Sequence, residues 1–420
     1  MEEFILVFKD LIQIISFLLS IWWIYTPILL YFLFIYVFKE YTHSKYTSSL
    51  EWTLLEIKGP KEAKQGPKAM EVVFTALHGI QEPPRWQKAF FYGEVQAWYS
   101  FEIVGKDKGI HFYIRTLKKF KNLVESHLYA QYPNSEITEV LEDHISVLPP
   151  VFKENGYDIF GTEYILAKED AYPIRTYVQF EELNPGREPE DIRRIDPLAS
   201  ITEILASLNP NEYIGIQILA SPTGDDWVKK GQEVIDKILG KTPKPQATFM
   251  SQVISFIDTL IPGGVNPTES PKEEKKKDQT PGQYEILKAV EASLSKFGYE
   301  VGIRIIYGAP KDVFQRARMS EIGGAFKQFN TYNLNGFKWN MKAATLARWP
   351  FKTWKVFLKK KMLLENYRER SFLGIQKRMI LNVEELATVF HFPDFSVKTP
   401  LIPRIEAKKG EPPVELPIAR

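Results

Sequence analysis

The 420-residue sequence contains no cysteine, which excludes disulfide scaffolds, thiolate zinc sites and cysteine nucleophiles. It has only six histidines, and no two are spaced as H-x-x-x-H or H-E-x-x-H, the patterns that place two metal ligands on one helix face. The carboxylate pairs Glu181-Glu182 and Asp225-Asp226 are adjacent rather than facing. We therefore expect no metal, no other cofactor and no enzymatic activity; an enzyme whose site has no sequence signature is the alternative.

Nucleotide-binding and hydrolase motifs are also missing. The fragment "ILGKTP" contains Gly240 and Lys241, but Ile235 occupies the position of the first P-loop glycine. Pro243 blocks the helix that should follow, so Gly240 is better interpreted as a helix C-cap. The chain has no Gly-x-Ser-x-Gly elbow.

The N-terminal region contains one long apolar run without a charged residue. It begins at Leu11, contains Trp22, Trp23 and Pro27, and ends at Phe38. Its 28 residues exceed the roughly 20 that a helix needs to cross a bilayer. A cleaved signal peptide fits poorly, because the start "MEEF" is acidic and the run is long. The run predicts a single membrane span within an anchor at residues 1–45, with a buried core helix as the alternative.

Flanking charges predict the orientation of this span. Glu2, Glu3, Lys9 and Asp10 precede it, whereas six lysines between residues 39 and 68 follow it. Since cationic residues stay on the cytoplasmic side, we expect a single-pass protein of the cytoplasmic (inner) membrane with its N-terminus outside. The bulk of the chain then lies in the cytoplasm.

The remaining sequence predicts an α+β protein. Residues 46–150 read strand, helix, hairpin, helix, strand, the order of a ferredoxin-like sandwich. Residues 151–334 repeat the element order with an insertion at 241–281. Within it, 247–261 predicts an amphipathic helix that lies on a membrane or a partner, or caps the core. Residues 263–281 are charged and apolar-poor, which predicts disorder.

A basic, aromatic segment begins the last predicted region, residues 335–420. Between residues 338 and 378, twelve Lys or Arg stand against two Glu. Basic residues interleaved with aromatics suit anionic lipid or nucleic acid, with a solvated helical face as the alternative. The candidate contact residues are Lys338, Lys342, Arg348, Lys352, Trp354, Lys355, Lys359, Lys360, Lys361, Arg368 and Arg370.

Several long stretches together resemble one bacterial family. They include "SFEIVGKDKGIHFYIRTLKKFKNLVESHLYAQYPNSEI", "DPLASITEILASLNPNEYIGIQIL", "FKQFNTYNLNGFK", "ILNVEELATVFHFP" and "RIEAKKGEPPVELPI". These are similar to the membrane-anchored N-terminal module of coupling ATPases in type IV secretion and conjugative DNA transfer. The likeness covers roughly residues 50–418. In that family the last two segments lead into a RecA-like motor, whereas this sequence stops at Arg420.

The resemblance implies a non-enzymatic component that tethers a separately encoded motor ATPase, or its DNA or protein substrate, at the membrane. A homo-oligomer would follow from the motor's ring. The segment "RMILNVEELATVF" can add to a partner's sheet edge. The expected docking residues are Leu381, Glu384, Glu385, Leu386, Phe390, Phe392 and Arg404. The alternatives are a scaffold that binds anionic lipid without a motor, and a disordered tail over residues 404–420.

Overall fold

The computed structural model describes residues 13, 16, 20, 22–59, 66–149, 156–182, 193–240 and 280–393. Leu11, the predicted helix 247–261 and Arg404 lie outside these residues, as does almost all of the 263–281 segment. The chain forms two compact units, Met1–Glu51 with Glu82–Ala97, and Trp52–Gln81 with Trp98–Arg420.

The first unit is built on α2 (Trp22–Ser49), which runs through Pro27. It is long and apolar enough to cross a membrane, and Trp22 and Trp23 are exposed. The returning segment 82–97 packs on it through a short π-helix (Lys88–Tyr92), where Phe90 meets Phe38 at 5.7 Å between ring centroids. Gly93, where this segment comes close to α2, has φ +70. A Cβ at this position would lie 2.2 Å from the Thr42 carbonyl oxygen. Only glycine fits both the backbone angle and the space.

The second unit contains a sheet in which nine described strands are all antiparallel. The first half supplies β1 (Trp52–Lys58), β2 (Tyr99–Lys106), β3 (Gly109–Leu117) and β4 (Glu136–Glu139). The second half supplies β5 (Tyr157–Leu166), β8 (Tyr213–Pro222), β9 (Gly298–Pro310) and β10 (Phe337–Trp339). The ninth strand, β11 (Met379–Asn382), pairs with the first residues of β9.

Both halves share one strand order. The sheet runs β10-β5-β9-β8-β2-β3-β1-β4, so each half is arranged fourth, first, third, second in chain order. The halves join where β2 pairs with β8, which makes one continuous sheet instead of two separate modules. The predicted boundary at residue 334 is also corrected, because β10 and β11 belong to this sheet. A separate 2-stranded sheet pairs β6 (Glu181–Glu182) with β7 (Arg193–Arg194).

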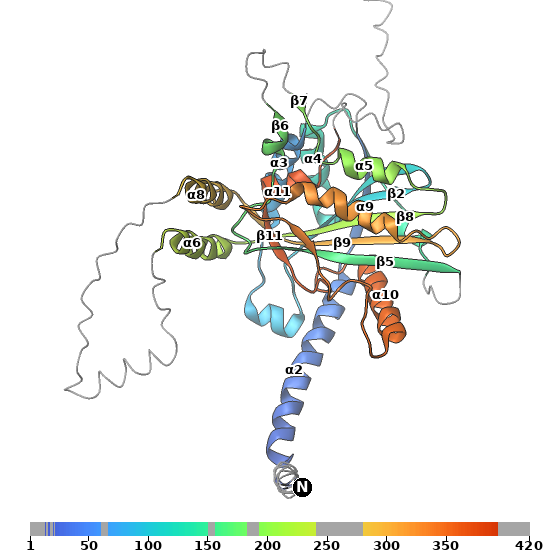
Figure 1. The fold of residues 1–420 in the computed structure, drawn as a ribbon. Coiled ribbons are helices and arrows are strands. Elements are labelled where there is room, and N and C mark those ends of the chain that lie inside the picture. Colours follow the sequence, from blue (N-terminus) through green and yellow to red (C-terminus); the bar gives the residue numbers. More distant parts are fainter. Residues whose placement is uncertain are drawn as a thin grey trace, which may run out of the picture. The chain divides into compact units, whose positions relative to one another are not determined.

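Helices cover both faces of the large sheet (Figure 1). One face carries α3 (Pro67–Leu77), α4 (Lys121–Gln131), α5 (Ala199–Ala206), α9 (Ala317–Phe326) and α11 (Val383–Val389). The opposite face carries α10 (Lys352–Glu369), with Leu364 and Tyr367 packed on Ile159, Tyr213 and Ile306. Helices α6 (Asp226–Ile238) and α8 (Pro281–Leu294) pack side by side near one end of the sheet. Burial of alternate strand residues on both faces gives two cores, one for each layer of helices.

Local sequence signals explain most element ends. The β2–β3 turn places Asp107 and Lys108 at positive φ, as a two-residue hairpin requires. Thr280 forms a capping box at the start of α8. A second capping box corrects a prediction: Asn382 and Glu385 end β11 and start α11, so the expected strand over residues 378–390 is mostly helix.

Candidate functional site

A row of polar residues crosses the sheet on the face that α10 covers. The register places one residue from each of six strands directly beside the next. In order they are Glu163, Arg304, Gln217, Glu102, Tyr113 and Glu56. The middle of this row is completely buried, so its polar groups need partners inside the protein.

Four members of this polar row, Glu163, Arg304, Gln217 and Glu102, bond to one another. Arg304 donates from Nη1 to Gln217 Oε1 at 2.9 Å and from Nη2 to Glu163 Oε1 at 3.3 Å. Gln217 donates to Glu102 Oε1 at 3.3 Å. These bonds link strands of both halves across the β2–β8 junction, so the row ties the two halves together.

The polar row also bonds to the last turn of α10 and to the segment that follows this helix. Arg304 donates to the Asn366 carbonyl at 2.9 Å, and Gln217 donates to the Tyr367 carbonyl at 3.0 Å. The backbone N–H of Gln376 donates to Glu163 Oε2 at 3.1 Å. The last turn of α10 and the segment up to residue 376 are therefore fixed by buried, directional bonds.

Arg370 completes this attachment. It is buried, has φ +52, and donates to both carboxylate oxygens of Glu102, at 2.6 and 3.2 Å. Its other nitrogen donates to Asp143 Oδ2 at 2.5 Å. Burial opposes ionisation of Glu102, but Arg370 and His144 outweigh it and hold the pKa of that carboxyl well below its usual range. For Glu163, burial wins over Arg304 and raises the pKa of the carboxyl.

A hydrogen-bonded chain of rings leads away from Glu102. His144 Nε2 lies 2.6 Å from Glu102 Oε2, and its Nδ1 lies 2.9 Å from the Tyr213 hydroxyl. The Tyr213 and Tyr367 hydroxyls are 2.8 Å apart. Burial raises the pKa of both phenols, which keeps them neutral as donors. Because all four groups are buried, this arrangement orients side chains and offers no open position for a substrate.

The N-terminal end of α10, by contrast, exposes large apolar side chains to solvent. Trp349 is 89% exposed, Phe351 74% and Trp354 61%, although aromatic rings of this size are normally at least partly buried. Leu358 and Met362 continue the exposed stripe at intervals of four residues, and Met341 lies exposed in the preceding segment. We call these six residues the α10 apolar stripe. Exposed Lys342, Arg348, Lys352 and Lys361 come from the same stretch of chain.

The structure separates the predicted lipid or nucleic-acid contacts into two groups. Six of them are exposed: Lys338, Lys342, Arg348, Lys352, Trp354 and Lys361. Lys355, Lys359, Lys360 and Arg368 are half-buried, and Arg370 is buried. In this second group, Lys359 donates to the Leu346 carbonyl, Lys360 pairs with Asp158, Arg368 donates to the Leu148 carbonyl, and Arg370 binds Glu102. Arg370 is thus a structural residue and is not available for an external ligand.

The predicted docking segment lies inside this chain's own fold. Leu381, Leu386, Phe390, Phe392 and Glu385 are all buried. The strand expected to extend a partner's sheet is β11, which pairs with β9. Glu384 is only half-buried, but it forms an ion pair with Lys296. Docking through these residues is corrected to intramolecular packing, because their backbone and side-chain contacts are already used.

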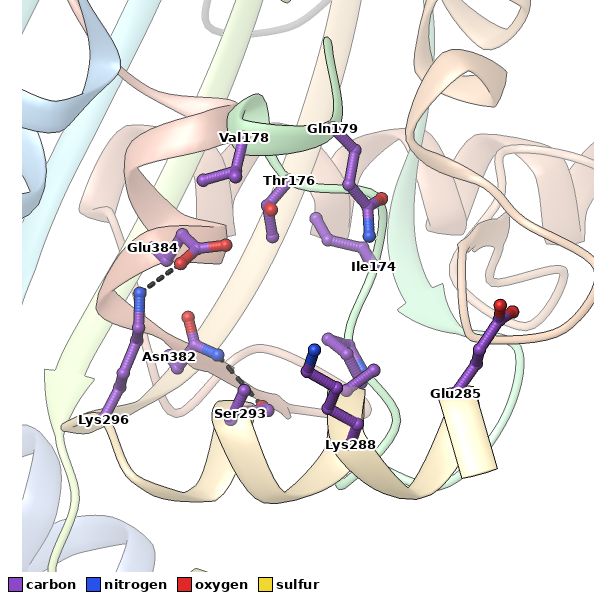
Figure 2. A pocket seen from close by; sticks show the side chains of 13 residues that line it. Ile174, Thr176, Val178, Gln179, Glu285, Lys288, Ser293, Lys296, Asn382 and Glu384 are labelled. Carbon is purple, nitrogen blue, oxygen red and sulfur yellow. Dashed lines mark hydrogen bonds and ion pairs between the residues drawn. The ribbon is translucent and has the colours of Figure 1, made fainter. Parts of the chain in front are cut away.

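Cavities lie around α8 and α6. The cavity of about 510 Å³ in Figure 2 lies between α8 and the segment around Ile174–Gln179. Its lining bonds are internal: Asn382 donates to Ser293 Oγ at 2.9 Å, and Lys296 pairs with Glu71 and Glu384. The lining residue Ile174 donates its backbone N–H to Glu385 at 2.8 Å, and burial raises the pKa of Glu385 to about 8. Among the described residues, no group of three or more His, Asp or Glu side chains could hold a metal ion.

A family model for a domain of unknown function (DUF8128) matches residues 38–404. The chain belongs to this family. The match starts at the last residue of the apolar run and includes both halves of the sheet, α10 and β11. No curated protein matches the chain.

The polar row was missed by sequence reasoning. Its residues come from six strands that are separated by up to about 250 positions, so no local spacing reveals them. A signal was nonetheless present: Glu102, Gln217 and Arg304 each stand between apolar residues in a strand. Because an isolated charge in a buried strand needs a partner, these residues could have been marked as members of an internal network.

Proposed function

We propose that this protein is a membrane-anchored scaffold whose second unit binds an anionic lipid surface through the α10 apolar stripe and the neighbouring basic residues. The observation that carries the proposal is the exposure of Trp349, Phe351 and Trp354 beside Lys352 and Lys361. An amphipathic surface with aromatic and aliphatic groups on one side and cations around them suits the membrane interface. Each nearby Lys or Arg adds about 1 kcal/mol of attraction to anionic lipid.

Lipid explains this surface better than nucleic acid does. Aromatic rings can stack on bases, but Leu358, Met362 and Met341 are aliphatic and gain little from a stacked base. All three gain from entering the interfacial region of a bilayer. The polar row bonds to the C-terminal end of α10 and so fixes this helix to the sheet, including its exposed N-terminal end.

We propose further that α2 spans the cytoplasmic membrane with its N-terminus outside, as the flanking charges indicate. We also propose that each half of the sheet is a ferredoxin-like module. The shared strand order of the two halves supports this description.

Because the sequence contains no cysteine, a single introduced cysteine can be labelled specifically to test the lipid contact. A single Leu358→Cys variant of the full chain would be labelled with an environment-sensitive fluorophore and placed in nanodiscs of neutral phosphatidylcholine, with or without phosphatidylglycerol. The emission should shift to the blue only with anionic lipid, and added salt should reverse the shift. Lys229→Cys, on the exposed side of α6, should show no shift. An unchanged emission at position 358 in both lipids would overturn the proposal.

The tethering of a motor ATPase stands as a second proposal. One observation favours it: the family match continues past Pro393, the last described residue, to residue 404. A segment that the family shares suits a partner contact, and we propose that docking lies in residues 394–420 rather than in β11. Deleting residues 394–420 should abolish co-purification with a motor subunit while leaving thermal unfolding unchanged. Unchanged co-purification would reject this role for the tail.

A further inference from the structure

Five lysines from four separate chain segments line one cavity of about 580 Å³ in the second unit. Lys168 follows β5, Lys230 and Lys237 lie on α6, Lys338 lies on β10, and Lys377 precedes β11. We call this the lysine cavity. Its volume is within the range of small-molecule sites in proteins.

The cationic charge of the lysine cavity is only partly balanced. Three carboxylates also line it, Glu169, Asp170 and Glu233. Glu169 is engaged by Lys237 at 3.3 Å. Burial raises the pKa of the Asp170 carboxyl, and Lys377 and Lys230 act against this. Five ammonium groups against three carboxylates leave an excess of positive charge at the cavity.

Three of the five lysines are engaged inside the chain: Lys237 with Glu169, Lys338 with the Ala167 carbonyl at 3.4 Å, and Lys168 with two further carbonyls. Lys168 donates to the carbonyls of Tyr332 and Asn333, at 3.0 and 2.9 Å. Lys230 and Lys377 form no ion pair within the described part of the chain, and both are exposed. The cavity thus combines three lysines that have hydrogen-bond or ion-pair partners with two exposed lysines that form no ion pair within the described part of the chain. Apolar residues complete the lining: Leu166, Trp227, Val234 and Ile380.

We propose that the lysine cavity binds a small molecule that carries two or more phosphate groups. Lysine acts toward phosphate as a compact point charge, so several lysines around one volume favour a ligand with several anionic oxygens. A single carboxylate would leave most of these ammonium groups unpaired. This site lies apart from the α10 apolar stripe and does not depend on the proposed membrane contact.

The test uses the full chain in a neutral detergent and isothermal titration calorimetry with tripolyphosphate, ATP and adenosine. Tripolyphosphate and ATP should bind, adenosine should not, and binding should weaken as salt is added. Lys230→Ala and Lys377→Ala should each raise the Kd at least about fivefold. Lys229→Ala is the matched control. Lys229 directly precedes Lys230 on α6, but it pairs with Asp226, and 78% of its side chain is exposed. Its Kd should stay within about twofold of the parent value.

A second control separates this cavity from the basic residues near α10. A Lys352→Ala, Lys361→Ala double variant should leave tripolyphosphate binding unchanged. Three results would overturn the proposal: no binding tighter than about 1 mM, adenosine binding as well as ATP, or loss of binding in the α10 variant but not in the cavity variants. Melting curves monitored by circular dichroism would verify that every variant is folded.

Discussion

Arg370 and Glu102 lie 268 positions apart in sequence, yet they form a bidentate pair in the core with donor–acceptor distances of 2.6 and 3.2 Å. Glu102 comes from β2 in the first half, and Arg370 is the residue after α10. The pair therefore fixes the C-terminal end of α10 to the middle of the sheet. Removal of either charge would leave its partner buried and uncompensated, which is far more costly than loss of an exposed pair.

Replacement of Arg370 by Met should lower the free energy of unfolding by about 3–5 kcal/mol, because Glu102 is then buried without its guanidinium partner. Chemical denaturation of the full chain in micelles, followed by tryptophan fluorescence, would measure this. Arg348→Met is the control, since Arg348 is exposed, and it should change stability by less than about 0.5 kcal/mol. The Glu102→Met, Arg370→Met double variant should cost less than Arg370→Met alone. An equal or greater cost would contradict the pairing argument.

Glu385 should make stability depend on pH. Burial raises its pKa in the folded protein from 4.5 to about 8. The folded state therefore binds more protons than the unfolded state between these values, and stability should fall as pH rises from 4.5 to about 8. Glu385→Gln cannot titrate and should flatten this part of the curve. Denaturation midpoints of the two proteins across this range would measure the difference, and parallel curves would exclude Glu385 as the titrating group.

Gly93→Ala should loosen segment 82–97 from α2. The new Cβ would lie 2.2 Å from the Thr42 carbonyl oxygen, in a backbone conformation that costs a non-glycine residue about 1–3 kcal/mol. Trypsin should then cut at Arg85 and Lys88 faster than in the parent protein. Gly79→Ala is the control, because a Cβ at Gly79 meets nothing within 4 Å. Equal cleavage of the Gly93 variant and the parent would show that the segment is held by other contacts.

Neutralising the cations near the α10 apolar stripe should weaken the lipid contact without unfolding the protein. Lys352→Gln and Lys361→Gln should each lower the equilibrium constant for docking by about fivefold, as about 1 kcal/mol per charge implies. The fluorophore at position 358 in anionic nanodiscs would report this. Glu203→Gln, an exposed charge on α5, serves as a control. If the emission is the same in the parent and in both lysine variants, these lysines do not contribute and the apolar side chains make the lipid contact.

Much of the fold was predictable from sequence because its signals are local. The order of strand, helix, hairpin, helix and strand predicted for residues 46–150 is found as β1, α3, β2 with β3, α4 and β4. The prediction of a strand across residues 378–390 was wrong because β11 is only four residues long and a capping box starts a helix immediately afterwards.

The candidate sites were harder to predict, because burial decides the role of a charge. Lys352 and Arg370 look alike in the basic segment, but one is exposed and the other is fully paired in the core. Likewise, "ILNVEELATVFHFP" looks like a free docking segment only until β9 is known to pair with it.

The apolar run, the order of strands and helices, and the lack of metal-binding and nucleotide-binding motifs can all be read from the sequence, since each depends on residues close together in the chain. In contrast, the folded chain was needed to show that both halves share one sheet, that Arg370 meets Glu102 and that five lysines line one cavity. Strand register and helix packing bring these residues together across hundreds of positions, and that information is not contained in any local pattern.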